Sequence, residues 1–151
     1  MRTFVDDLRT AFEIDPGAPG IVMATLAGEL HEMGALLATA TAASDGWDVT
    51  YLGPNLPAEQ IALVARQKAA RAIGLSIVLP TDEAALDEEL RKLRRHVSAG
   101  ITVIVGGRGA SKVSAALGDI DAIQVADLQQ LRQVLRTLPP RIEEPAHVRA
   151  R

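Results

Sequence analysis

The sequence of 151 residues contains no cysteine. Disulfides, thiolate metal ligands, cysteine nucleophiles and iron–sulfur clusters are therefore excluded. Any metal would have to be held by histidine or carboxylate, and the chain has 3 histidines. The absence of cysteine thus leaves few side chains that could hold a transition metal.

An excess of positive charge is also missing, because 16 Lys and Arg face 19 Asp and Glu for a net charge of −3. Binding to a phosphate backbone depends on clustered cations, so we expect no direct nucleic-acid binding through this segment. No apolar run reaches the roughly 18 residues of a membrane span, and the opening MRTFVDDLRT lacks the apolar core of a secretion signal. We therefore expect a cytoplasmic protein that does not enter a membrane.

Short β-branched segments alternate with amphipathic ones at intervals of roughly 25 residues, which is the pattern of βαβ units. The segments expected to be strands, covered on both faces, are 20–26, 47–53, 72–79, 102–109 and 122–126. With 48% hydrophobic residues the chain can form the core of one domain. We predict an α/β fold: a doubly wound, five-stranded parallel sheet of flavodoxin-like (Rossmann-like) order 2-1-3-4-5.

Residues with known preferences for helix ends lie between these segments. Pro57, Asp82 and Asp127 stand where helices should begin, and Gly46 and Gly100 stand where helices should have ended. These positions support the alternation of strands and helices.

The two ends of the chain are less patterned. Residues 1–18 are predicted to be an N-terminal extension with one or two helical turns, and residues 19–138 the domain itself. The stretch 139–151 is rich in proline and charge and is predicted to be a flexible tail. His147 lies in that tail and is assigned no function.

The predicted sheet also predicts where a ligand would bind. In doubly wound sheets, ligands lie beyond the carboxyl ends of the strands at the switch point, here between the first and third strands. His31 follows the first strand in GELHEMG, while GLSIVLP and VGGRG end the third and fourth. Three separate segments are therefore expected to line one site.

The third strand segment has one nearly bare face. Alternation places Ile73, Leu75, Ile77 and Leu79 on one side and Ala72, Gly74, Ser76 and Val78 on the other. Glycine and serine weaken a central strand unless another group must approach it closely. Together with the small residues of GALLATATAA and the pair Gly106 and Gly107, this face could frame a narrow slot. Tight packing of a helix on the sheet is the alternative, and the Ser76 hydroxyl could bond to nearby backbone instead.

These residues resemble a known family. The motifs E-L-H-E-M-G (29–34), S-I-V (76–78) and G-G (106–107), in this order, are similar to the D/E-x-H-x-x-G, S-x-L/V and GG signature of cobalamin (vitamin B12)-binding domains. The resemblance covers roughly residues 18–138. Four longer segments are most similar to the B12 domains of MerR-type regulators, including light-sensing repressors: GELHEMG, GWDVTYLGPNLP, GLSIVLP and VGGRGA. Mutases usually have Asp in place of Glu29.

The resemblance implies that cobalamin, as adenosylcobalamin or methylcobalamin, binds base-off. The benzimidazole tail would enter the slot, and His31 would be the lower ligand of the cobalt. The cofactor-binding residues it implies are Glu29, Leu30, His31, Glu32, Met33, Gly34, Gly74, Ser76, Val78, Gly106, Gly107 and Arg108.

Several of these residues have an implied role. Glu29 could accept the other ring N–H of His31 and so fix its tautomer, and the helix N-terminus after His31 favours a neutral ring. Leu30, Glu32 and Met33 would border the corrin, and Gly34 would leave room for the ring and tail. Ser76 would bond to the benzimidazole nitrogen, and Gly106 and Gly107 would let the nucleotide tail pass close to the backbone.

Simpler interpretations stand beside these roles. A histidine at the start of a helix is often only a solvated surface residue. Arg108 could reach the phosphate of the tail, or remain in solvent. The basic run RKLRRH (91–96) ends a helix that begins with acidic residues, so the helix dipole accounts for it better than nucleic acid does.

Two functions follow from the resemblance. In the first, the domain is a cobalamin-dependent sensory or regulatory module that changes its self-association or its binding to a protein partner. In the second, it is the corrinoid-carrying subunit of a mutase or methyltransferase, with the chemistry on another chain. Neither makes this chain an enzyme by itself. A phosphorelay receiver of the same fold would need a phosphoacceptor Asp after the third strand, where Leu79 stands.

Overall fold

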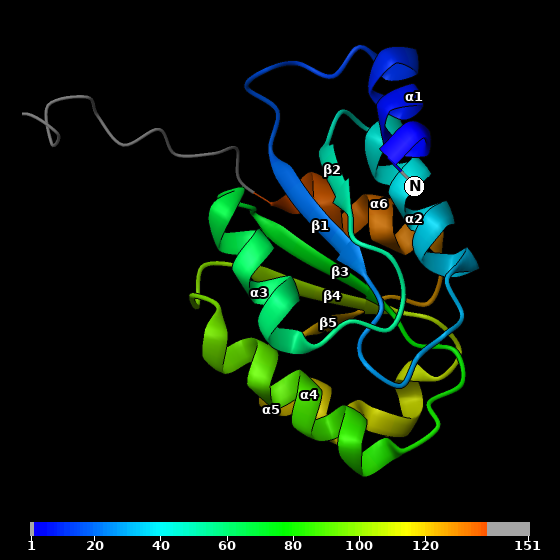
Figure 1. The fold of residues 1–151 in the computed structure, drawn as a ribbon, viewed down its shortest axis with the longest axis vertical. Helices are drawn as coiled ribbons and strands as arrows, with labels where there is room; N and C mark the ends of the chain where they lie inside the picture. The colour runs from blue at the N-terminus through cyan, green and yellow to red at the C-terminus, as the bar shows by residue number, and fades with distance from the viewer. Residues whose placement is uncertain (1, 139–151) are drawn as a thin grey trace, which may run out of the picture.

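A computed structural model describes residues 2–138. Its sheet has five strands in the order β2-β1-β3-β4-β5, all parallel, with helices on both sides (Figure 1). The strands are β1 (Gly20–Ala24), β2 (Asp48–Tyr51), β3 (Ala72–Ser76), β4 (Thr102–Gly106) and β5 (Ile123–Gln124). The predicted fold class and strand order are confirmed.

The helices alternate with the strands as expected. They are α1 (Arg2–Phe12), α2 (Met33–Ser44), α3 (Ala58–Gln67), α4 (Glu83–His96), α5 (Ser114–Asp119) and α6 (Leu128–Thr137), with a short 3₁₀ helix η1 (Ala110–Val113) before α5. Across residues 2–138, none of these helices combines the length and hydrophobicity needed to cross a membrane.

Helices cover the two faces of the sheet with different side chains. The side covered by α3, α4 and α5, here called the packed face, is filled by branched aliphatics such as Ile73, Ile77 and Leu90. The side covered by α1, α2 and α6, here called the cavity face, has a smaller cluster that includes Met23 and Ile104.

Predicted helix ends agree with the structure at most positions. The carboxylates of Asp82 and Asp127 accept the amides of Ala85 and Gln130 and so cap α4 and α6. Gly46 follows α2 at φ +91°, a conformation that glycine adopts without strain. The prediction for Gly100 is wrong: α4 already ends at His96.

The N-terminal segment is more regular than the sequence suggested. Instead of one or two turns, α1 runs from Arg2 to Phe12, and its Val5 and Leu8 pack against the cluster of the cavity face. The predicted tail 139–151, with His147, lies outside the described residues. The division of the chain at 18 and 138 stays a prediction.

All five strands are shorter than the predicted segments, and β3 and β5 differ from the prediction in further ways. β3 stops at Ser76, so Leu79, expected on its packed face, is instead 57% exposed in the loop that follows. β5 has only two residues, both exposed, because it is an edge strand paired with β4 alone. The expectation that every strand is covered on both faces is therefore wrong for β5.

Candidate functional site

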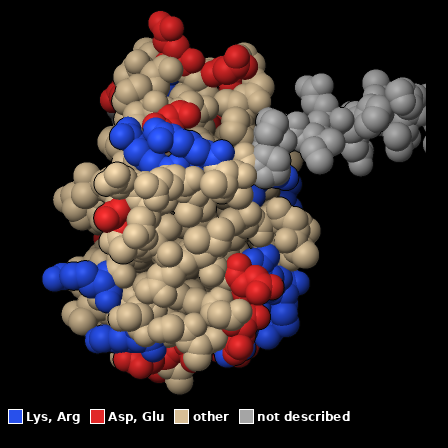
Figure 2. Space-filling view, turned by 180° about the vertical axis from the view of Figure 1, so that it is seen from behind, with Lys and Arg blue, Asp and Glu red and all other residues tan. Residues whose placement is uncertain are grey.

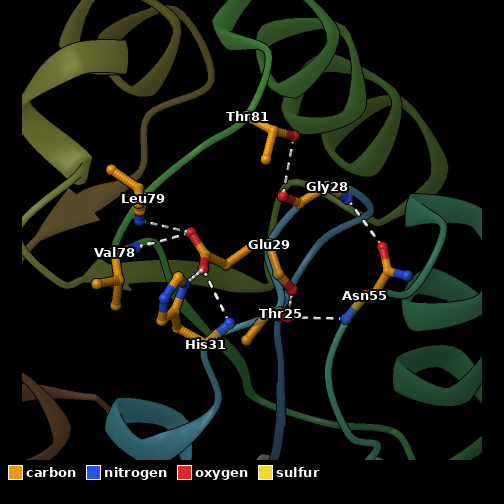
Figure 3. Close-up of polar contacts among 8 residues, drawn as sticks. All are labelled: Thr25, Gly28, Glu29, His31, Asn55, Val78, Leu79 and Thr81. Atoms are coloured by element: carbon orange, nitrogen blue, oxygen red, sulfur yellow. Dashed lines mark hydrogen bonds and ion pairs between the residues drawn. The ribbon is translucent and has the colours of Figure 1, made fainter.

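The loop that follows β1 bends back over the carboxyl edge of the sheet and presents Glu29 and His31 there. Glu29 is 1% exposed, although it is a carboxylate at the sheet edge. Its Oε2 accepts the amides of Val78 and Leu79, both at 2.9 Å, from the loop after β3 (Figure 3). The loop after β3 thus supplies the amide donors that allow the charge of Glu29 to be buried.

The other carboxylate oxygen of Glu29 binds His31. Oε1 lies 3.0 Å from the His31 amide and 2.8 Å from its ring Nδ1 (Figure 3). Burial by itself raises the pKa of Glu29, but the hydrogen bonds from His31, Val78 and Leu79 outweigh it and hold that pKa below its ordinary value. The carboxylate is therefore ionised and accepts, so Nδ1 is the protonated ring nitrogen.

In the neutral imidazole, this arrangement leaves the lone pair on Nε2 of His31. The His31 side chain is 55% exposed, whereas that of Glu29 is 1% exposed. An imidazole whose Nδ1–H is held by a carboxylate has a fixed orientation and a more basic Nε2, which is how metal-binding histidines are commonly supported. The contact expected between Glu29 and His31 is present.

Large apolar side chains lie exposed close to His31 in the chain. Leu30 and Met33 are 67% and 68% exposed, and Leu37 is 51% exposed on the next turn of α2. Leu79, which the sequence had placed on the packed face, adds a fourth exposed side chain from the loop that contacts Glu29. On the side of the molecule opposite to that of Figure 1, charged residues lie mainly around the margin of a broad uncharged surface (Figure 2). Exposed apolar side chains such as Leu30, Met33 and Leu37, close together in the chain, are typical of a binding surface.

A cavity of about 310 Å³ lies on the cavity face between the sheet, α2 and α6. Its lining includes seven residues predicted for the site: Gly34, Gly74, Ser76, Val78, Gly106, Gly107 and Arg108. A wall formed by residues 125–128 and Leu131 was not predicted. One sequence feature could have indicated this wall: the predicted fifth strand ends at the same edge of the sheet, so the residues that follow it begin there.

The glycines around the cavity have local reasons of their own. A Cβ on Gly74 would lie 2.2 Å from Sδ of Met23, which is paired opposite it on β1. Gly107 has φ +101°, and a Cβ there would lie 2.2 Å from the Ile77 carbonyl oxygen. The close approach of the Ile77 backbone therefore accounts for Gly107, which is a contact other than the packing of a helix on the sheet. The passage of a nucleotide tail along it stays a prediction.

Glu32 makes a contact that the sequence did not indicate. It was expected to border a corrin ring, but its Oε2 accepts the Tyr51 hydroxyl at 2.6 Å. Burial and the adjacent Glu32 carboxylate both raise the pKa of Tyr51, so the phenol remains the donor.

The basic run 91–96 lies far along the chain from this site. Its arginines bind nearby carboxylates and backbone carbonyls. Arg91 pairs with Asp119 and Arg95 with Glu88, while Arg94 donates to two backbone carbonyls. These local contacts agree with the interpretation of the run as a solvated helix face.

Comparison with known proteins identifies the family. Residues 19–128 match the family model of the B12 binding domain. The chain belongs to this family. The resemblance stated from the motifs is confirmed, and cobalamin is the cofactor of the domain.

Curated relatives of this B12 binding domain are longer and of several kinds. The methionine synthase of Mycobacterium tuberculosis is 27% identical over 125 residues, which are 82% of this chain and 10% of that protein. The HTH-type transcriptional repressor CarH of Myxococcus xanthus is 34% identical over 89 residues, 59% of this chain and 30% of the repressor. A corrinoid protein of Desulfitobacterium hafniense is 30% identical over 96 residues, 63% of this chain and 44% of its own length. The chain thus spans less than half of each relative.

Solved structures share the fold of the B12 binding domain. A cobalamin-binding protein from Desulfitobacterium hafniense superposes with a TM-score of 0.69 at 22% identity, covering 89% of this chain and 68% of that one. The monomethylamine corrinoid protein of Methanosarcina barkeri gives 0.64 at 16% identity, covering 89% and 63%. At these identities the likeness establishes the fold.

The residues present fit cobalamin. A corrin supplies four nitrogens to cobalt, so one imidazole suffices from the protein, and residues 2–138 contain no cluster of three or more side chains that could hold a bare metal ion. The cavity has the size expected of a small-ligand site. Gly34 and Ser76 both line it, and a Cβ on Gly34 would come within 2.8 Å of the Ser76 hydroxyl, so α2 approaches β3 closely at this glycine.

Proposed function

We propose that this domain is a sensory or regulatory module that holds cobalamin base-off, with Nε2 of His31 as the lower cobalt ligand. The observation that supports this best is a half-exposed imidazole whose Nδ1 is fixed by a fully buried carboxylate, Glu29. A merely solvated histidine would not need a buried, ionised partner with two further amide donors.

Each part of the site has a task in this proposal. The exposed Leu30, Met33 and Leu79 receive the corrin, and the cavity beside Ser76 takes the benzimidazole tail. Arg108 lines the same cavity and is exposed, so it can neutralise the phosphate of the tail. When bound, cobalamin would supply a cobalt–carbon bond, and its adenosyl or methyl group would alter the surface that the domain offers to a partner or a second copy.

The regulatory interpretation is supported by the repressor CarH, which has the highest identity of the three relatives described, 34%. A second candidate is a corrinoid-carrying subunit of a mutase or methyltransferase, which the matches to a methionine synthase and a corrinoid protein favour. In that case a separate chain holds the substrate, and this domain only positions the cofactor.

Ligation is tested by electron paramagnetic resonance of cob(II)alamin bound to protein labelled with ¹⁵N-histidine. The axial nitrogen splitting should change from the triplet of ¹⁴N to the doublet of ¹⁵N, because the ligand comes from the protein. His31→Ala should abolish this doublet, and His96→Ala is the matched control because His96 lies at the end of α4 and bonds to the Lys92 carbonyl. A triplet in the labelled wild type would contradict histidine ligation.

The sensory and carrier functions can be distinguished by measuring the molar mass and partner binding of the domain in different ligand states. If the module is regulatory, the purified domain with adenosylcobalamin or methylcobalamin should differ in molar mass by light scattering, or in partner binding, before and after illumination. If mass and partner binding are identical in every ligand state while a co-purified partner restores methyl-transfer or mutase activity, the carrier function replaces the sensory one.

A further inference from the structure

The loop after β2 contacts the loop that carries His31, although the family motifs do not include it. Asn55 Oδ1 accepts the Gly28 amide at 2.9 Å, and the Asn55 amide donates to Thr25 Oγ1 at 2.8 Å (Figure 3). The Thr25 hydroxyl in turn donates to the Glu29 carbonyl at 2.6 Å. Asn55 and Thr25 therefore link the β2–α3 connection to both residues that precede Leu30.

The backbone at Asn55 is suited to this contact. Asn55 has φ +61°, in the left-handed region that asparagine tolerates better than other residues with a Cβ. Thr25 is fully buried, so its hydroxyl has to be satisfied within the protein, and Asn55 and Glu29 supply its two partners. The network is complete and inaccessible to water at Thr25.

A second contact from β2 lies on the other side of His31. Tyr51, the last residue of β2, donates to Glu32, the residue immediately after His31 and the N-cap position of α2. Segment 28–32 is therefore held by β2 and its loop at both ends. Within this segment, the Glu29 side chain is held by the loop after β3.

We propose that Asn55 and Tyr51 are positioning residues that fix segment 28–32, and with it the direction of His31 Nε2, before cobalamin arrives. The proposal rests on the proposed role of His31 as lower ligand. A ligand arm that is already ordered loses less conformational freedom on binding, so a larger share of bound cofactor should be ligated by His31.

The test compares three substitutions in the full chain. Asn55→Gly tolerates the left-handed backbone and removes the side chain that carries the Oδ1 acceptor, whereas Asn55→Asp keeps a carboxylate oxygen at that place. Asp15→Ala is the matched control, because Asp15 Oδ1 accepts the Gly17 amide at 2.7 Å in the loop before β1, at the opposite edge of the sheet. One hydrogen bond corresponds to roughly 2- to 10-fold in an equilibrium.

The first measurement uses the protein without cobalamin. Hydrogen exchange of the Gly28 amide should accelerate roughly 2- to 10-fold in Asn55→Gly and return to the wild-type rate in Asn55→Asp, with no change in Asp15→Ala. An unchanged Gly28 rate in Asn55→Gly would overturn the proposal, whether or not the protein binds cobalamin.

The second measurement uses the protein with cob(II)alamin and the ¹⁵N-histidine splitting. The ratio of histidine-ligated to unligated cobalt should fall roughly 2- to 10-fold in Asn55→Gly and recover in Asn55→Asp. Equal ratios in wild type and Asn55→Gly would overturn the positioning role while leaving the proposed function intact. Absence of the doublet from wild type would defeat the proposed function, and the exchange rates would still decide whether Asn55 holds the loop.

Tyr51→Phe provides an independent variant should Asn55→Gly not fold. It keeps the ring that fills the cavity-face cluster and removes only the hydroxyl bound to Glu32. The same fall in the ligated fraction is expected, with faster exchange of the Leu36 amide, which donates to the Glu32 carbonyl at 2.9 Å. Unchanged values of both would overturn the role of Tyr51.

Discussion

The two faces of one sheet are built from different kinds of side chain. On the packed face, α4 contributes Leu86, Leu90 and Leu93, all buried, and β3 contributes Ile73 and Ile77. On the cavity face, the buried residues of α2 are Ala35, Thr39, Ala42 and Ala43. On the packed face α4 thus covers the sheet with large aliphatics, whereas on the cavity face α2 covers it with small residues and α6 adds Leu131 and Leu135.

This difference shows how a stable fold can leave room for a ligand. The packed face holds the larger of the two clusters of buried apolar residues, and burial of apolar area stabilises the fold. Small side chains on α2 and at Gly74 and Ser76 leave a cavity of about 310 Å³ on the other face. In the proposed function, stability and binding therefore depend on opposite sides of β3, and substitutions should separate them.

The largest expected effect is on the packed face. Leu90→Ala should lower the free energy of unfolding by about 2–5 kcal/mol, because Leu90 is fully buried and its truncation leaves a cavity. Chemical denaturation measures this value, and Leu37→Ala on the half-exposed side of α2 is the control, with a change within about 0.5 kcal/mol. The additional stabilisation by cobalamin should stay the same in Leu90→Ala; its loss would show that the two faces are not separate.

The next effect is on the cavity face. Cobalamin at a hundredfold excess over its Kd should stabilise the wild type by about 2.7 kcal/mol, and Ser76→Leu should remove this gain by filling the cavity. The ligand-free variant should lose no more than about 1–3 kcal/mol, the usual cost of overpacking. Thermal unfolding with and without cobalamin measures both. Ser76→Ala leaves the space open and removes only the hydroxyl, so it should lose no more than about 0.5–1.5 kcal/mol of this gain. A folded Ser76→Leu that binds normally would mean that the tail does not enter this cavity.

A smaller effect concerns how the bare face of β3 is covered. Gly74→Ala places a methyl group against Met23, so a double-mutant cycle with Met23→Ala should show a coupling energy of about 0.5–3 kcal/mol. The unfolding free energies of both single variants and the double variant give this quantity. Additive values would mean that Met23 moves aside without cost and that Gly74 is not required by packing.

The smallest effect compares one helix cap on each face. Asp82→Ala and Asp127→Ala should each lower the unfolding free energy by about 1 kcal/mol, because each carboxylate caps a helix. Asp127 also lines the cavity, so only its substitution should weaken cobalamin binding in a titration. Equal weakening by Asp82→Ala would point to a general effect of stability on binding.

Much of this organisation could be predicted from residue patterns. The alternation of β-branched and amphipathic segments predicted the strand order, and the side-chain period of β3 predicted a slot on its bare face. Errors arose where a residue's neighbours matter more than its type. Leu79 continues the period of β3, but β3 ends at Ser76 and the Leu79 amide bonds to Glu29. Gly107 is part of a family motif, but the Ile77 carbonyl is what requires glycine there.

The sequence by itself determined the fold class, the helix caps at Asp82 and Asp127, and the proximity of the motifs, because these depend on local periodicity and on the common edge at which parallel strands end. Only the tertiary structure decided how Glu29 is held, because its partners are backbone amides 49 and 50 residues away that any residue type would supply. The same holds for the contacts of Asn55 with Gly28 and of Tyr51 with Glu32. Such contacts form only when separate loops meet, so no pattern along the chain records them.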